Sequence, residues 1–304
     1  MTLESNRRIF SVQVRVRRYA SRGKYRGAEA YLLAELRSAD LQAADRIFLW
    51  NELGMIYKYL GKFSVSHQLY RRTLRKIHEC LPGPDRDFFL ADLYHNLAGL
   101  EHARRHFRRA EKFARKGLQI RRRVASARSL PVAVDMAALA AVLVGQEKFA
   151  EAERLYRQAL RTYRREYGLA HGETAILLGN LAALCQARHR FKRARDYYRR
   201  ALKSKRRAFG ATHPSVAITL NNLGMLCQAQ GDPLGAEGCM SEALKILRRR
   251  VGCRHFQYRA IEKNYQSVLA NAFCRRPFLT STFGVRGASG EKTWTKRTSG
   301  QSRC

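Results

Sequence analysis

Apolar residues recur along the chain with the spacing of amphipathic helices, and one block of residues returns about every 42 positions. In each block a small residue is followed by a leucine eight places later. The small residues are Ala28, Ser66, Ala110, Ala152, Ala194 and Ala236, and the leucines are Leu36, Leu74, Leu118, Leu160, Leu202 and Leu244. Both series advance in steps of 38, 44, 42, 42 and 42 residues. Because the positions keep one phase over six copies, the pattern indicates a repeat protein.

Each block predicts a pair of helices. It holds two stretches of helical apolar spacing and no alternating strand pattern of comparable length. Three blocks place a glycine between the two stretches, where a residue with positive φ can end a helix. These glycines are Gly23, Gly61 and Gly231. Since a two-helix unit cannot bury both of its faces alone, we expect the copies to stack on a shared core.

The residues that fill this pattern resemble the tetratricopeptide repeat. The similarity lies in a Leu-Gly or Leu-Ala pair, a Gly-x-aromatic-x-x-Ala turn and a Tyr-x-x-Ala-Leu segment. The 42-residue period, with the segment from Phe209 to Gly224, resembles the longer repeat of kinesin light chains and many bacterial repeat proteins. We therefore expect an all-α fold, a right-handed α-solenoid of about six helix-turn-helix hairpins with a C-terminal capping helix.

The repeat phase also predicts the domain organisation. The solenoid should span residues 5–271 and finish with a lone capping helix at 257–271. The six hairpins are expected at about 5–40, 43–80, 86–126, 131–168, 173–209 and 215–250. Residues 272–304 carry seven basic residues and one acidic residue among many Ser, Thr and Gly, which predicts a basic disordered tail.

The charge of the chain is strongly positive. It has 59 Lys and Arg against 24 Asp and Glu, a formal net charge of +35. The 45% of hydrophobic residues can build a core, which argues against wholesale disorder. No apolar run approaches the roughly 20 residues of a membrane span. The seven cysteines form no C-x-x-C pair and no secretory signal pattern opens the chain, so we expect a reducing, cytoplasmic location.

The sequence shows no conventional catalytic, cofactor or metal signature. It has no glycine-rich phosphate loop, no G-x-S-x-G and no H-E-x-x-H, so we predict a protein that is not an enzyme and needs no cofactor. His171, His213 and His255 do recur at the repeat period. Helices of neighbouring hairpins lie about 8–10 Å apart, too far for these histidines to converge on one metal ion. We expect them to close the loops before the next helix.

The resemblance implies that the first helices of the hairpins line a concave groove. The polar and Met positions of that groove are Asn51, Met55, Lys58, His95, His102, Asn180, Gln186, Asn221, Asn222, Met225 and Gln228, and the small or apolar ones are Gly99, Ala137, Ala141, Val144, Gly179 and Ala183. Lys58 is the one permanent charge among them. Such a nearly neutral groove suits an apolar or weakly polar peptide.

The asparagines of the first helices have two interpretations. The resemblance implies that they hold the backbone of a bound peptide, as in kinesin light chains. The alternative, weighed equally for Asn96, Asn180, Asn222 and Asn264, is that they tie one hairpin to the next. Asn51 and Asn221 are expected to point more toward the groove.

A second candidate surface is formed by arginines that follow the last leucine of each second helix. They are Arg122, Arg123, Arg164, Arg165, Arg206, Arg207, Arg248 and Arg249. Cations at a helix C-terminus gain about 0.3–1 kcal/mol each from the helix dipole. That gain does not explain so large an excess of charge, which should attract polyanions.

Two main function hypotheses follow from the sequence. The first is a non-catalytic scaffold or adaptor that binds a partner protein or peptide in its groove. The alternative is a protein associated with RNA, DNA or an acidic partner through the outer arginines, with non-specific binding favoured over sequence-specific binding. A third hypothesis is an accessory subunit of an enzyme system.

Overall fold

The computed structural model describes residues 3–21 and 23–274, which form thirteen α-helices and no strand. The predicted all-α fold of helix-turn-helix repeats is therefore confirmed. The chain divides into two compact units, residues 1–189 and residues 190–304. The predicted basic tail lies outside the described residues except for 272–274, which continue the last helix. Among the described residues, none of the helices combines the length and hydrophobicity that crossing a bilayer requires.

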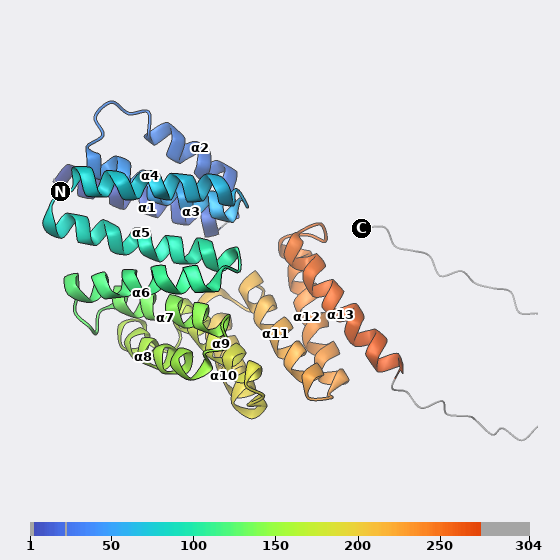
Figure 1. The fold of residues 1–304 in the computed structure, drawn as a ribbon. Helices are drawn as coiled ribbons and strands as arrows, with labels where there is room; N and C mark the ends of the chain where they lie inside the picture. The colour runs from blue at the N-terminus through green and yellow to red at the C-terminus, as the bar shows by residue number, and fades with distance from the viewer. Residues whose placement is uncertain (1–2, 22, 275–304) are drawn as a thin grey trace, which may run out of the picture. The chain divides into compact units, whose positions relative to one another are not determined.

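The first unit is a series of antiparallel helices joined by short turns (Figure 1). Its helices are α1 (Leu3–Ser21), α2 (Tyr25–Glu35), α3 (Ala43–Tyr59), α4 (Phe63–Cys80), α5 (Gly83–Ala103), α6 (Phe107–Val124), α7 (Leu130–Val144), α8 (Phe149–Tyr167) and α9 (Gly172–Ala187). Each helix packs against the next one in sequence, and the first helices α1, α3, α5, α7 and α9 also pack on one another in series. The first helices thus form one layer of the unit.

The second unit contains α10 (Phe191–Phe209), α11 (Pro214–Ala229), α12 (Pro233–Arg250) and α13 (Phe256–Cys274). Helices α11 and α12 form a hairpin, and α13 packs mainly against α12. Asp232 caps α12 by accepting a hydrogen bond from the backbone N–H of Gly235 at 2.8 Å, and Pro233 occupies the first turn. Helix α13 is the lone terminal helix that the sequence predicts.

The small residue of each repeat lies where two helices pack closely. Its six occurrences are all fully buried, with 0% exposure. Ser66 shows how close the approach is, because its hydroxyl donates a 2.7 Å hydrogen bond to the carbonyl of Gly54 on the neighbouring helix. A Cβ at Gly54 would stand 2.3 Å from the ring of Tyr70, so this crossing tolerates neither a larger residue nor a shift. The period read from the sequence therefore marks helix-packing positions.

The turn between the two helices of each repeat contains one residue with positive φ. Gly23, Gly61 and Gly231 have φ between 68° and 75°, as the sequence predicts. At the same position in the other three repeats stand Arg105, Glu147 and His189, with φ of 61°, 60° and 55°. A left-handed conformation costs a residue with a Cβ roughly 1–2 kcal/mol. Three turns therefore carry a strain that glycine would remove.

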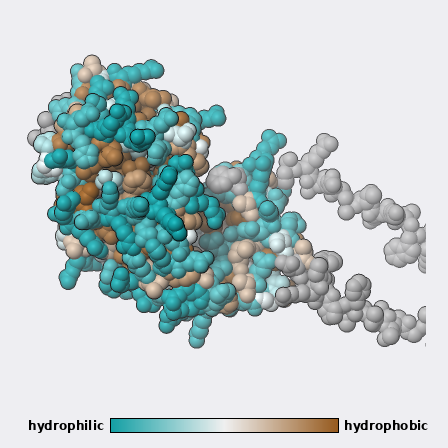
Figure 2. Space-filling view, in the orientation of Figure 1, coloured by the Kyte–Doolittle hydropathy of each residue, from teal (hydrophilic) through white to brown (hydrophobic). Residues whose placement is uncertain are grey.

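Two basic residues of the second helices are buried. Arg121 on α6 is 5% exposed and Lys205 on α10 is 8% exposed. Lys205 donates hydrogen bonds to the Thr219 hydroxyl at 2.8 Å and to the Ser215 carbonyl at 3.3 Å, and burial lowers the pKa of its ammonium. Most other basic side chains lie outside, and Figure 2 shows a largely hydrophilic surface on the visible face.

Candidate functional site

A pocket of about 450 Å³ opens on the first helices α3, α5 and α7 of the first unit. Five of the predicted groove residues line it together: Lys58, His95, Gly99, His102 and Ala141. Further lining residues, including Phe63, Ala98, Ala103 and Val142, are apolar. The arrangement is a shallow apolar floor with one cation and two imidazoles at its wall. We call it the α3–α5–α7 pocket.

Lys58 places a desolvated positive charge in this pocket. Its Nζ lies 4.6 Å from the centre of the Tyr59 ring, a cation–π contact. A Cβ at position 99 would stand 3.4 Å from Nζ, so Gly99 leaves room for the ammonium group. Burial lowers the pKa of Lys58, and the described residues offer it no carboxylate at ion-pair distance. The pocket therefore presents an unneutralised cation above an apolar floor.

His102 is held neutral beside that cation. Burial lowers the pKa of its imidazole, the charge of Lys58 lowers it further, and a hydrogen bond with the backbone of Ala141 partly opposes the shift. Its ring meets the ring of Phe107 edge to face, with centroids 5.5 Å apart. His102 can consequently act as a hydrogen-bonding group at neutral pH without adding charge.

His95, on the other side of the pocket, belongs to a buried ionic group. Its Nδ1 lies 2.7 Å from Oδ1 of Asp135 on α7. The other oxygen of Asp135 accepts a 3.1 Å hydrogen bond from Nε of Arg121 on α6. Arg121 also forms an ion pair with Asp92 on α5. Three consecutive helices are thus joined by one network behind the pocket.

Sequence reasoning missed this network, although the repeat register contains a signal for it. Position 121 is followed at 42-residue steps by Tyr163, Lys205 and Leu247, and all four residues are buried. A basic side chain at a position otherwise filled by Tyr and Leu needs a partner inside the protein. Asp135 is that partner. Its equivalents at 42-residue steps are Leu177, Thr219 and Ile261, which are also buried.

The asparagines favour the structural interpretation at two places. The Asn96 amide donates to Oδ1 of Asn51 at 3.0 Å, and the Asn264 amide donates to Oδ1 of Asn221 at 3.1 Å. Each bond joins successive first helices within one unit. Asn51, predicted to point toward the groove, is only 6% exposed, so this part of the prediction is wrong: the side chain lies between α3 and α5.

The remaining groove positions do not all meet in one pocket. Met55 on α3 is half-buried and packs against the core of the first unit. On α9, Asn180 is exposed and Gln186 is half-buried. In the second unit the half-buried groove positions lie on α11, and they are Asn221, Asn222, Met225 and Gln228. These residues stay predicted contacts, outside the α3–α5–α7 pocket.

The eight arginines predicted to contact polyanions are all exposed. Among them, Arg165 pairs with Glu166 at 2.7 Å, Arg206 with Glu242 at 2.7 Å, and Arg123 with Asp87 at 3.9 Å. Exposed pairs of this kind contribute about 0–1 kcal/mol and are easily exchanged for another anion. The arginines are therefore available at the surface.

The three periodic histidines are helix caps. Nδ1 of His171, His213 and His255 accepts the backbone N–H of the residue two places later, at 3.2, 3.1 and 3.3 Å. The ring of His171 also stacks on Tyr167, with centroids 4.2 Å apart. The expected role in the loop before the next helix is confirmed for all three. In the described part of the chain, no three His, Cys, Asp or Glu side chains cluster as a metal site.

Comparison with known families gives one match. A model described as tetratricopeptide repeat matches three overlapping stretches, residues 89–165, 132–207 and 173–249. Together these stretches cover more than half of the chain and contain the helices α6 to α11 completely. No curated protein sequence matches the chain significantly.

Solved structures show the same fold at low sequence identity. BtubC (BKLC) from P. vanneervenii is 22% identical, with a TM-score of 0.57, over 97% of this chain and 100% of that one. A putative kinesin light chain with nearly identical TPR-like repeats from Podosopora anserina is 18% identical, with a TM-score of 0.55, over 69% and 98%. A Rap protein complexed with Competence and Sporulation Factor is 14% identical, with a TM-score of 0.66, over 89% and 72%. The predicted α-solenoid class and its kinesin-light-chain-like repeats are confirmed.

Proposed function

Because the chain belongs to the tetratricopeptide repeat family, we propose that it is a non-catalytic scaffold that holds a segment of a partner protein in the α3–α5–α7 pocket. The observation that carries the proposal is the convergence of three successive first helices on one apolar pocket with a desolvated lysine. The structurally similar Rap protein was solved in complex with Competence and Sporulation Factor, which supports a binding role for this fold.

The pocket favours an extended or helical peptide with a small apolar side chain and a polar group beside it. Ala98, Gly99 and Ala141 leave the floor low, so a peptide backbone can approach the helices closely. Lys58 and the neutral His102 offer hydrogen bonds to a carbonyl at that point. The buried network behind His95 keeps one wall fixed before binding, which reduces the entropy cost of recognition.

Peptides selected from a random library on the full chain test this proposal. We expect the selected peptides to bind at least roughly tenfold more weakly when Ala141→Arg fills the pocket, since that change removes the contact area and adds a second cation beside Lys58. Gln119→Arg, which adds the same charge on the exposed face of α6, is the matched control and should leave binding unchanged. Equal affinity for all three chains would contradict the proposal.

A second candidate function rests on the eight exposed arginines at the ends of the second helices. In that function the chain associates with a polyanion, either nucleic acid or an acidic protein. Salt discriminates the two candidates, because phosphate contacts weaken steeply as the salt concentration rises and contacts in an apolar pocket change little.

A further inference from the structure

A larger pocket, of about 860 Å³, lies at the turns of the third and fourth hairpins in the first unit. Its basic lining residues are Arg105, His106, Arg108, Arg109 and Lys148, and no acidic residue lines it. It is distinct from the α3–α5–α7 pocket, with which it shares no lining residue. We call it the turn pocket.

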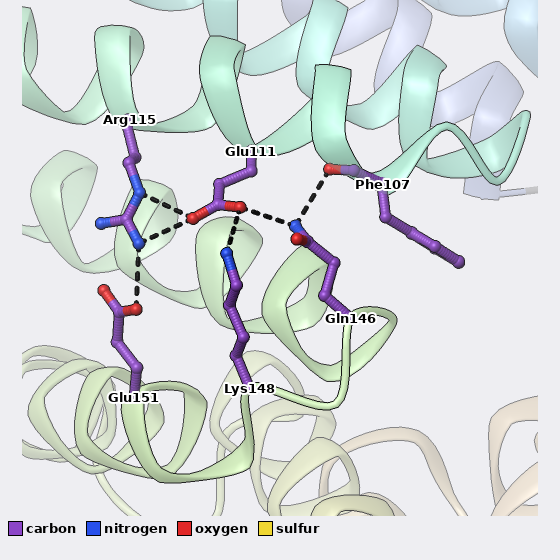
Figure 3. A network of polar contacts seen from close by, with 6 residues as sticks. All are labelled: Phe107, Glu111, Arg115, Gln146, Lys148 and Glu151. Atoms are coloured by element: carbon purple, nitrogen blue, oxygen red, sulfur yellow. Dashed lines mark hydrogen bonds and ion pairs between the residues drawn. The ribbon is translucent and has the colours of Figure 1, made fainter.

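Two of the five basic residues already have carboxylate partners. His106 Nδ1 lies 2.9 Å from Glu101, and Lys148 Nζ donates to Glu111 at 2.7 Å. Figure 3 shows Glu111 at the centre of this second arrangement, also accepting hydrogen bonds from Gln146 and Arg115. Although burial opposes the shift, these hydrogen bonds lower the pKa of Glu111 to about 2. The Glu111 carboxylate is therefore bound by Lys148, Gln146 and Arg115 and forms no ion pair with the arginines of the turn pocket.

Arg105, Arg108 and Arg109 are exposed, and in the described part of the chain no carboxylate lies within ion-pair distance of them. Their positions also cost stability. Arg105 takes a φ of 61°, the left-handed conformation that Glu147 and His189 share and for which three other turns use glycine. Arg108 and Arg109 stand in the first turn of α6, where the positive end of the helix dipole disfavours cations. Arg105 gains a cation–π contact, with its guanidinium 5.9 Å from the centre of the Phe107 ring, but no neutralising anion among the described residues. Local rules broken without a neutralising partner are typical of a functional site.

We infer that the turn pocket binds an acidic segment of a partner protein, a short run of Asp and Glu side chains. Guanidinium groups bind carboxylates through paired, charge-assisted hydrogen bonds, and three guanidinium groups without a carboxylate partner among the described residues line this pocket. The pocket volume lies within the range of ordinary ligand sites and accommodates several side chains. This inference goes beyond the proposed function, because it requires no occupant in the α3–α5–α7 pocket.

The aromatic residue of the turn pocket favours a peptide over a single-stranded nucleic acid. Nucleic-acid channels use exposed aromatic faces on which bases stack. The Phe107 ring is half-buried, meets His102 edge to face at 5.5 Å and packs so closely on Gly145 that a Cβ there would stand 2.5 Å from it. It is a wall of the pocket and offers little face for a base.

Fluorescence anisotropy of a labelled oligoglutamate peptide with the full chain tests the inference. Arg108→Gln with Arg109→Gln should weaken binding by at least roughly tenfold, since each arginine contributes a hydrogen bond to a charged group. Arg154→Gln with Arg161→Gln removes the same charge from exposed sites on α8 that line neither pocket, and should change binding less than about twofold. Equal losses in the two double variants would overturn the site.

Two further measurements test whether Arg105 acts in binding or in folding, and whether the partner is a protein or a nucleic acid. Arg105→Gly should weaken oligoglutamate binding while raising the melting temperature, a combination that a structural role for Arg105 would not produce. Unchanged binding with a raised melting temperature would count against the inference. Binding of a labelled RNA oligomer should not depend on Arg108 and Arg109. If RNA binding depends on these two arginines and oligoglutamate binding does not, the choice of an acidic protein as partner is overturned.

Discussion

His95 Nδ1 lies 2.7 Å from Asp135 Oδ1, so one wall of the α3–α5–α7 pocket is anchored by a carboxylate that is 4% exposed. The same carboxylate accepts a hydrogen bond from Arg121, which also pairs with Asp92. The shape of the pocket therefore depends on an ionic group whose other members, Asp135 and Arg121, are buried behind this wall. Changes behind the pocket should alter binding as well as stability.

Arg121→Met should lower the free energy of unfolding by about 3–5 kcal/mol, because it leaves the Asp135 charge buried without its main partner. Urea denaturation followed by circular dichroism measures the loss. Arg122→Met, at the neighbouring exposed position, should stay within about 0.5 kcal/mol of the parent chain. A small effect of Arg121→Met would show that the network contributes little.

Ala152→Leu should destabilise the first unit by about 1–3 kcal/mol or more, because the extra side chain must enter a closely packed helix crossing. The residue is fully buried, whereas Ala150 on the same helix is exposed. Ala150→Leu is thus the matched control and should change the unfolding midpoint little. Similar midpoints for both variants would argue against the assigned packing of α8.

Glu147→Gly should stabilise the chain by about 1 kcal/mol, since it relieves a left-handed residue at φ 60°. Glu147→Ala removes the same side chain but keeps a Cβ, so it serves as the control and should give no comparable gain. Thermal and urea unfolding of the two variants separate backbone strain from side-chain loss. A gain of equal size in both would trace the effect to the carboxylate.

His213 should make the stability of the chain fall as the solution becomes acidic. Burial lowers the pKa of its imidazole, and Arg250 and Lys205 lower it further. Because the folded pKa lies below the unfolded value of about 6.5, the unfolded chain takes up a proton first as the pH drops below that value. The stabilising effect is present above about pH 6.5 and is lost as the pH falls through the folded pKa.

His213→Asn tests this dependence, because asparagine also caps helices but does not titrate. Between about pH 7.5 and pH 5.5 the variant should lose less free energy of unfolding than the parent chain. Gln119→Asn, an exposed change on α6 that removes no titratable group, should keep the parent pH dependence. Parallel curves for the parent and His213→Asn would contradict the assignment.

The repeat phase predicted the hairpins because packing between helices requires small residues and leucines at fixed intervals. Ala152 and Ala194 could be placed from the sequence for that reason. The groove positions Lys58 and His102 followed from the register of the first helices, and the structure brings both into one pocket. The register alone did not place Asn51, which lies between helices.

The sequence did not reveal features in which a residue lies in a place or takes a backbone conformation that is unusual for its type. Arg121 and Lys205 are charged yet buried, and Arg105 has a Cβ yet takes the conformation of glycine. Composition assigns basic residues to the surface, since burying a charge is costly unless a partner is present. The partner becomes evident only when the stacking of the hairpins brings position 121 against position 135.

The polar pairs buried between hairpins also restrict which copies can follow one another. Arg121 on α6 meets Asp135 on α7, whereas the matching position on α9 is Leu177, which has no group to receive a guanidinium. In a misfolded chain that skipped one hairpin and packed α6 on α9, the Arg121 guanidinium would be buried beside Leu177 without a carboxylate. Hairpins of nearly identical shape are therefore not interchangeable. Moving or deleting one hairpin should lower the stability of the fold, and more so where it leaves a buried charge without its partner.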